Sequence, residues 1–440
     1  MLRLAAVAAA LSARATASAA AAAAAAATAA PLTEWQLVRL PNAPCLDGSP
    51  STIYVKAGSG GDANKLILFW EGGGWCESLL DCLARSNTTL GSSRTYPQTT
   101  TRYASRDVLL PDCATNPRFC NYASVYAPYC DGASRSSNVL EPVVVDGTPL
   151  FFRGYDVLRA TVDALAQAAG PGFGVPPLLA MTELLVSGSS AGGLTTLLHL
   201  DFIAARAAEA SPGIRVSGVP EVGFFVDAES IWAGRHLYTE IYTRIADFGN
   251  ISAGEPDQVN AACVAANPGG ERWRCFMAQY TYPFVSTRTF LLQSQVDQFQ
   301  TGNILAPNLN ISYAASTYPP FAPCILNPGP VACNSSQFAQ WQGYSSQFFT
   351  ALNASLAATP ADVLARSGGV ITSCPIHTTA ISGISHKIVV GGASMYEWLV
   401  RWYDSKTPVP GGSFTYDVAW PGDTSCPRPT LEDEELLLMN

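Results

Sequence analysis

The sequence predicts an α/β fold, in which a mostly parallel sheet is flanked by helices. Short apolar runs alternate with helical patterns in the first half, two of these runs end in glycine-rich clusters, and only 13% of the 440 residues are charged. Strand, helix, strand, helix in this order requires parallel pairing with crossovers. An aromatic content of 10% with so little charge excludes a disordered chain and a coiled coil.

The first elements follow directly from their patterns. Lys65–Trp70 is an apolar run that stops at a glycine cluster, as a buried strand does. Gly154–Ala169 carries apolar residues at helical spacing. Leu184–Val186 is the next predicted strand, and a helix is predicted over Leu194–Ala208. These four elements form the parallel core of the prediction.

The second half of the chain is less regular. Residues 250–345 are rich in Pro, Asn and Cys, and we expect cap-like excursions around one more core strand at Thr289–Gln293. Gly369–Thr372 is a further strand candidate, and Pro408–Asn440 is predicted to be loop-rich.

Residues 1–30 are expected to lie outside the fold, which leaves a single domain over residues 31–440. Two arginines, no acidic residue, an apolar run at Leu4–Leu11 and an alanine tract indicate a secretory signal peptide. An organellar transit peptide and a low-complexity leader are the alternatives. No stretch has the length and hydropathy of a membrane span.

Twelve cysteines and four histidines argue for disulfides and against metal. The cysteines lack paired zinc spacing, so we expect no metal site and no cofactor. Disulfides require an oxidising compartment, either the cell exterior or wall or, alternatively, an organelle lumen. N-glycosylation sequons begin at Asn87, Asn250, Asn310, Asn334 and Asn353. A net charge of −9 argues against a nucleic-acid partner.

The strongest motif is Gly188-Ser189-Ser190-Ala191-Gly192, which matches G-x-S-x-G between a predicted strand and a predicted helix. In that context the glycines permit a sharp turn that exposes the middle serine, so Ser190 is the predicted nucleophile. The alternative is a Gly/Ser turn in which serine caps the helix.

A glycine run after the Lys65–Trp70 strand is the second motif. Its backbone N–H groups are unobstructed, as an oxyanion hole requires, and the N–H of Ala191 would be the partner donor. The alternative is a turn that needs positive φ.

A base and an acid should follow the serine in the order acid, then histidine. His377 is favoured because it follows a predicted strand, with His386 in reserve. His199 lies too far along the helix that begins after Ser190, and His236 precedes any late strand. For the acid, Asp297 beyond the Thr289–Gln293 strand is preferred and Asp227 is second.

Together these blocks resemble the pectin acetylesterase family, which includes the animal deacylase Notum. The resemblance covers residues 35–426 and includes EGGGWC with Cys82, Gly223–Asp227, and Ser373–His377. It implies Ser190, Asp297 and His377 as the triad. It also implies Gly73, Gly74 and Ala191 as oxyanion donors and pairs Cys76 with Cys82. Three departures concern the substrate pocket and one disulfide: Phe299, Glu221-Val222 and Thr378 stand where the family usually has other residues.

The resemblance implies a secreted serine esterase that removes O-acetyl groups from a cell-wall polysaccharide such as pectin. Alternatives are a Notum-like deacylase for longer acyl chains and a catalytically silent binding protein on the same scaffold. We expect a monomer whose partner is the acyl-ester substrate.

Overall fold

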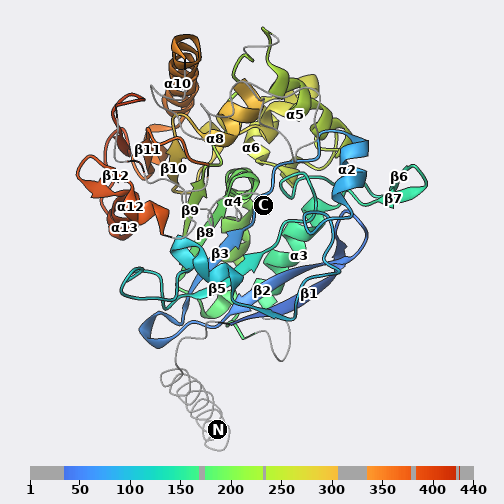
Figure 1. Ribbon diagram of the computed structural model, residues 1–440. Helices are drawn as coiled ribbons and strands as arrows, with labels where there is room; N and C mark the ends of the chain where they lie inside the picture. The colour runs from blue at the N-terminus through green and yellow to red at the C-terminus, as the bar shows by residue number, and fades with distance from the viewer. Residues whose placement is uncertain are drawn as a thin grey trace, which may run out of the picture.

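The computed structural model describes residues 34–167, 174–230, 234–305, 334–377, 383–422 and 426. A ten-stranded sheet with the order β14-β11-β10-β9-β8-β3-β5-β2-β1-β4 forms its centre (Figure 1). Neighbouring strands pair in parallel from β14 through β11, β10, β9, β8 and β3 to β5. At the other end of the sheet, β2, β1 and β4 pair antiparallel with their neighbours. This arrangement confirms the predicted α/β class.

The strands of this sheet are β1 (Trp35–Pro44), β2 (Pro50–Lys56), β3 (Lys65–Trp70), β4 (Thr99–Thr100), β5 (Ala123–Ala127), β8 (Glu183–Ser189), β9 (Arg215–Glu221), β10 (Phe290–Ser294), β11 (Gly368–Thr372) and β14 (Ser413–Tyr416). Two small ladders lie apart from it, formed by β6 (Val143–Val145) with β7 (Thr148–Leu150) and by β12 (Val389–Val390) with β13 (Ala393–Ser394).

The helices are α2 (Leu79–Arg85), α3 (Gly154–Gln167), α4 (Ala191–Ala210), α5 (Leu237–Phe248), α6 (Ala261–Ala266), α7 (Ala278–Thr281), α8 (Gln298–Gln300), α10 (Ser335–Ala358), α11 (Ala361–Leu364), α12 (Ile384–Lys387) and α13 (Met395–Asp404).

The predicted core elements are all present, with ends that differ by a few residues. The C-terminal tail is different, because the segment predicted to be loop-rich contains β14, which pairs in parallel with β11 at one edge of the sheet. Three of its four residues are half-buried and Tyr416 is exposed, and the strand lacks a continuous apolar run, so nothing in its pattern indicates a strand. The leader assigned to residues 1–30 lies outside the described residues.

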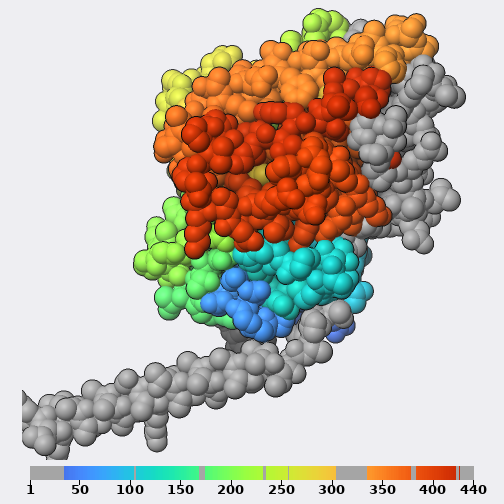
Figure 2. All heavy atoms as spheres, turned by 90° about the vertical axis from the view of Figure 1, so that its left-hand side faces the viewer, coloured from blue at the N-terminus to red at the C-terminus, as the bar shows by residue number. Residues whose placement is uncertain are grey.

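The two faces of the sheet are covered by different helices because side chains alternate along each strand. In β3, Leu66 and Leu68 belong to the cluster that includes α3. Ile67 and Phe69 belong to the opposite cluster, which includes α13. In Figure 2 the red C-terminal segment lies directly above the cyan one. The ring contacts of Phe119 with Tyr396 and Tyr403 join these two segments.

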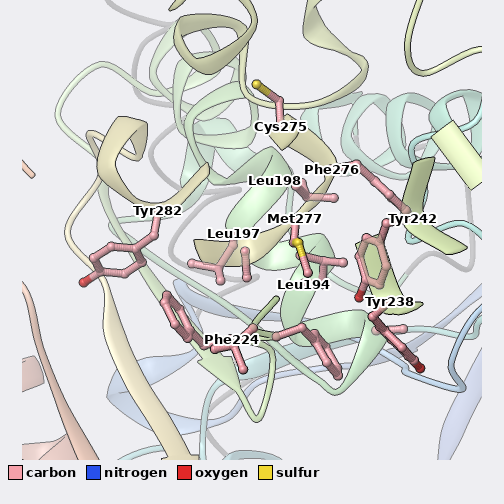
Figure 3. Packing of buried hydrophobic residues seen from close by; sticks show 14 of the residues in the cluster. Leu194, Leu197, Leu198, Phe224, Tyr238, Tyr242, Cys275, Phe276, Met277 and Tyr282 are labelled. Atoms are coloured by element: carbon pink, nitrogen blue, oxygen red, sulfur yellow. The ribbon is translucent and has the colours of Figure 1, made fainter. Parts of the chain in front are cut away.

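A third cluster lies on the helices of the chain's middle part and surrounds the N-terminal half of α4. Figure 3 shows Leu194, Leu197 and Leu198 packed among aromatic side chains from the loop after β9, from α5 and from the α7 region. The middle of the chain, expected as cap-like excursions, thus contains helices that bury α4. Each leucine side chain that is fully buried in this way stabilises the fold by about 1.5–3 kcal/mol.

Disulfides hold several of the loops between these elements. The structure pairs Cys45 with Cys130, Cys76 with Cys82, Cys113 with Cys120, Cys263 with Cys275 and Cys374 with Cys426. The pair implied by the family resemblance, Cys76–Cys82, is confirmed. Thr378, one of the three departures, lies outside the described residues, and Cys374 is bonded to the C-terminal tail instead.

Candidate active site

Ser190 lies in the turn between β8 and α4, in a backbone conformation with φ 59° and ψ −123°. A non-glycine residue held at such angles costs of order 1–3 kcal/mol and points to a functional role. The turn is possible because the glycines two positions before and two after Ser190 lack side chains. A Cβ at Gly192 would lie 2.1 Å from the carbonyl oxygen of Trp70, and one at Gly188 would lie 2.4 Å from the oxygen of Gly192.

His377 connects Ser190 to Asp297 through its two ring nitrogens. Its Nε2 lies 2.8 Å from Ser190 Oγ, and its Nδ1 lies 2.9 Å from both carboxylate oxygens of Asp297. When Nδ1 carries the ring proton and donates a hydrogen bond to the carboxylate, Nε2 is unprotonated and can accept the proton of the serine hydroxyl. The arrangement therefore has the connectivity of a nucleophile, a base and an orienting acid.

The sheet explains why residues so distant in sequence meet. Ser190 follows β8, Asp297 follows β10 and His377 follows β11, and these strands run in parallel close together in the sheet. Their carboxyl ends therefore lie at one edge. Asp297 is fully buried and also accepts a hydrogen bond from the backbone N–H of Gln300, 2.9 Å away, which fixes the carboxylate.

The glycine-rich loop after β3 lies against the turn that carries Ser190. A Cβ at Gly72 would lie 2.2 Å from the oxygen of Ser189. Gly73 and Gly74 have φ of 151° and 65°, which favour glycine. Among the described residues, no acceptor is recorded for the N–H groups of residues 72–75. Ala191 begins α4, so its N–H has no acceptor within the helix. In the described part of the chain, these predicted donors therefore meet the requirement that an oxyanion hole places on its N–H groups.

The other three histidines have different surroundings. His199 is fully buried in α4, and burial lowers its pKa to about 3, so it stays neutral. His386, the reserve base, stacks on Tyr396 with ring centroids 4.0 Å apart, and burial lowers its pKa. His236 Nδ1 lies 2.9 Å from Asp227 Oδ1. Asp227, the second choice of acid, is therefore bound to His236, whereas His377 binds Asp297.

Aromatic side chains fill the space beside the histidine and the glycine loop. Phe299 stacks on the imidazole of His377, with centroids 4.8 Å apart and planes at 25°. Trp75 packs against Phe225 at 4.8 Å and Tyr242 at 5.0 Å. The sequence singled out Phe299 only as a departure from a family pattern, and nothing in the spacing placed it on the base.

Sequence reasoning also missed two buried arginines behind the glycine loop, Arg85 and Arg135. No local pattern distinguishes them from surface arginines. In the described parts of the chain, no group of three or more His, Cys, Asp or Glu side chains is arranged to hold a metal ion. None of the described helices is long and apolar enough to cross a bilayer.

A mostly parallel sheet with a serine, a histidine and an aspartate hydrogen-bonded at its carboxyl edge defines the class, which is an α/β-hydrolase-like protein. The family model described as pectinacetylesterase matches residues 24–427, so the chain belongs to the pectinacetylesterase family. This membership confirms the resemblance seen in the sequence blocks and makes the chain a carboxylic-ester hydrolase.

Similar proteins include two branches. Pectin acetylesterase 11 of Arabidopsis thaliana is 29% identical over 351 residues, which are 79% of this chain and 80% of that protein. Palmitoleoyl-protein carboxylesterase notum1' of Xenopus laevis is 31% identical over 264 residues, which are 58% of this chain and 50% of that protein. Human palmitoleoyl-protein carboxylesterase NOTUM is 30% identical over 273 residues, 58% of this chain and 49% of that protein.

Proposed function

We propose that this chain is a secreted serine esterase that removes O-acetyl groups from a cell-wall polysaccharide such as pectin. The observation that carries the proposal is the single imidazole, His377, within 2.8 Å of Ser190 Oγ and 2.9 Å of the Asp297 carboxylate. The longer matches to pectin acetylesterases than to the Notum proteins support the choice of substrate.

In the proposed mechanism, Ser190 Oγ attacks the ester carbonyl while His377 Nε2 takes its proton, and Asp297 stabilises the imidazolium. The N–H groups of Gly73, Gly74 and Ala191 bind the tetrahedral oxyanion. His377 then gives its proton to the leaving sugar oxygen, so that the sugar departs as an alcohol and Ser190 remains acetylated. Water, deprotonated by His377, attacks this ester, and Ser190 regains its proton as acetate departs.

A short acyl group is favoured by the packing beside the site. Trp75 is only 1% exposed, and its indole is surrounded by the rings of Phe225, Tyr242 and Phe299. A long acyl chain entering from this side would have to displace closely packed rings, which is costly because interiors are packed at crystal-like density. An acetyl group makes no such demand.

Secretion is supported by the five disulfides of the described residues, because such bonds persist in oxidising compartments. The signal-like composition of residues 1–30 is in keeping with this route. Edman sequencing of the protein purified from culture medium would test it, and an N-terminus beyond residue 30 is expected.

The decisive test compares Ser190→Ala with Ser189→Ala, because both serines are buried and adjacent. Ser190→Ala should lower kcat for p-nitrophenyl acetate by about 10⁶-fold, to background, and abolish acetate release from acetylated pectin. Ser189→Ala should stay within about threefold of the wild type, because Ser189 Oγ has no recorded hydrogen bond among the described residues. Unchanged activity in Ser190→Ala would overturn the nucleophile, and a preference for p-nitrophenyl palmitate would overturn the acetyl assignment.

A further inference from the structure

Two buried arginines hold the glycine-rich loop by its carbonyl oxygens. Arg85, at the end of α2, is 6% exposed, and it donates from Nη1 to the oxygen of Gly73 at 2.9 Å and from Nη2 to the oxygen of Trp75 at 3.1 Å. Arg135 is fully buried and donates from Nη1 to the oxygen of Glu71 at 3.3 Å. Three carbonyls of one short loop are thus bound to cationic groups.

Each arginine is itself fixed in place. Arg135 also donates to the carbonyl oxygens of Ala127 and Pro128, at 2.8 and 3.0 Å, so it joins the loop after β3 to the loop after β5. Its guanidinium lies over the ring of Trp70, 4.7 Å from the centroid. Arg85 is held on α2, which the Cys76–Cys82 disulfide ties back to the glycine loop. Neither side chain can adjust freely.

The carbonyl contacts determine where the loop's N–H groups point. In a planar trans peptide, the carbonyl of one residue and the N–H of the next point in opposite directions. The oxygen of Gly73 faces Arg85, so the N–H of Gly74 faces away from Arg85. The next clamped peptide illustrates the rule, because the oxygen of Trp75 also faces Arg85 and the N–H of Cys76 is bound to Gly132, 3.1 Å away.

We propose that Arg85 is a positioning residue for ester hydrolysis, which holds the Gly73–Gly74 peptide so that the N–H of Gly74 is preoriented toward the oxyanion. Arg135 holds the preceding Glu71–Gly72 peptide in the same way. The proposal rests on the proposed function and deepens it. Glycines at 73 and 74 cannot hold this geometry alone, because their backbones are the least restricted of any residue.

Arginine suits this role better than lysine. The planar guanidinium presents two N–H groups in a fixed fork, whereas an ammonium is a single point charge on a flexible stem. The fork of Arg85 reaches the carbonyl oxygens of two peptides of the loop, Gly73–Gly74 and Trp75–Cys76. Its positive charge also polarises the Gly73–Gly74 peptide, so the Gly74 N–H becomes a stronger donor to a developing negative charge.

The test uses Arg85→Met, Arg85→Lys and the matched control Arg94→Met. Arg94 has a side chain that is 72% exposed, and it pairs with Asp47. The two substrates are p-nitrophenyl acetate and its thionoester analogue, in which sulfur replaces the carbonyl oxygen. An oxyanion hole built for oxygen strongly prefers the oxygen ester, so the ratio of the two rates reports the geometry of the hole.

Arg85→Met should lower kcat for the oxygen ester by about 10²-fold with little change in KM, because a misdirected donor is lost mainly in the transition state. The thionoester rate should fall by less, so the oxygen-to-sulfur ratio should shrink by about tenfold. For Arg85→Lys, kcat and the oxygen-to-sulfur ratio should lie between the values of Arg85→Met and the wild type. For Arg94→Met, both should match the wild type.

Equal losses for both esters in a folded Arg85→Met would assign the residue a merely structural role and overturn the proposal, as would a kcat within twofold of the wild type. Folding is checked by near-UV circular dichroism, and the ratio measured on Arg85→Lys decides the outcome if Arg85→Met does not fold. A wild type that hydrolyses neither ester would instead count against the proposed function, so the two failures are distinguishable.

Discussion

The described part of the chain contains two aspartate–histidine pairs with the same nitrogen-to-oxygen distance, and the two pairs have different surroundings. Asp297 and His377 are 2.9 Å apart, as are Asp227 and His236. The imidazole of His377 is 12% exposed and its far nitrogen reaches Ser190, whereas that of His236 is 50% exposed. Asp227 is further occupied by the hydroxyls of Thr239 and Tyr280.

The difference shows that an aspartate–histidine contact does not by itself make a base. A pair whose histidine is half exposed is worth about 0–1 kcal/mol because water screens it. In a buried pair the same contact fixes which nitrogen carries the proton and where the other one points. The Asp297–His377 pair differs because its second nitrogen meets the hydroxyl of Ser190, 2.8 Å away, in the turn after β8.

The largest expected effect separates the two carboxylates. Asp297→Asn should lower kcat for p-nitrophenyl acetate by about 10⁴-fold, because an amide no longer holds His377 in the tautomer that accepts the serine proton. Asp227→Asn should stay within about threefold of the wild type. Steady-state kinetics on both variants, with circular dichroism to confirm folding, provide the check. Similar losses in the two variants would show that the pairs are not functionally distinct.

The next largest effect is expected at the Cys374–Cys426 disulfide, which holds the loop that carries His377. Cys374, shortly before His377, is bonded to Cys426 across 52 residues, and replacing both by serine should lower the free energy of unfolding by about 2–5 kcal/mol. Activity should fall as well, because the loop that carries the base is released.

The matched control replaces both Cys113 and Cys120 by serine. Their disulfide closes a loop with a sequence separation of only 7 residues. This replacement should cost about 2 kcal/mol less, because a shorter loop loses less entropy on closure. Urea unfolding and ester hydrolysis measure both quantities. If this control lost as much activity as the replacement of Cys374 and Cys426, the Cys374–Cys426 disulfide would have no particular role in positioning His377.

A smaller effect is expected at the ring that stacks on the base. Phe299→Leu removes the flat surface 4.8 Å from the imidazole centroid and should lower kcat by about tenfold, because the contact is worth about 0.5–1.5 kcal/mol. Phe299→Tyr keeps the ring and should retain most of the activity. A Leu variant as active as the wild type would mean that Asp297 alone orients the imidazole.

The smallest effect concerns the exposed pair. His236→Gln should change kcat by less than twofold and the free energy of unfolding by less than about 1 kcal/mol, because the interaction with Asp227 is screened. Kinetics and thermal unfolding are the measurements. A loss of tenfold or more would place His236 on the substrate path and remove the contrast between the pairs.

The sequence predicted the central strands because their patterns are local. Lys65–Trp70 is an apolar run bounded by a glycine cluster, and β3 has the same limits. The edge strand β14 could not be predicted, because its half-buried residues owe their conformation to pairing with β11 rather than to their own pattern. The helices that bury α4 were missed for a similar reason, since their contacts come from distant parts of the chain.

At the site, spacing predicted the position of Ser190 but left two acids open from the residues alone. Asp227 and Asp297 both follow apolar runs, and only the tertiary structure turns one toward His236 and the other toward His377. Arg85 and Arg135 could not be anticipated, because the burial of an arginine depends on the loops that surround it. Sequence therefore identifies residues at strand ends more readily than the groups that orient them.

The packed glycines around the nucleophile also matter to protein engineers. At positions 72, 188 and 192 a methyl group would meet main-chain atoms, so a substitution there would displace the backbone around Ser190 instead of reshaping the site. The rings of Phe225 and Phe299, whose centroids are 5.9 Å apart beside His377, meet side chains instead, so acyl selectivity is more readily altered there, at the cost in kcat expected for Phe299. Libraries limited to these two positions would be small enough to screen exhaustively.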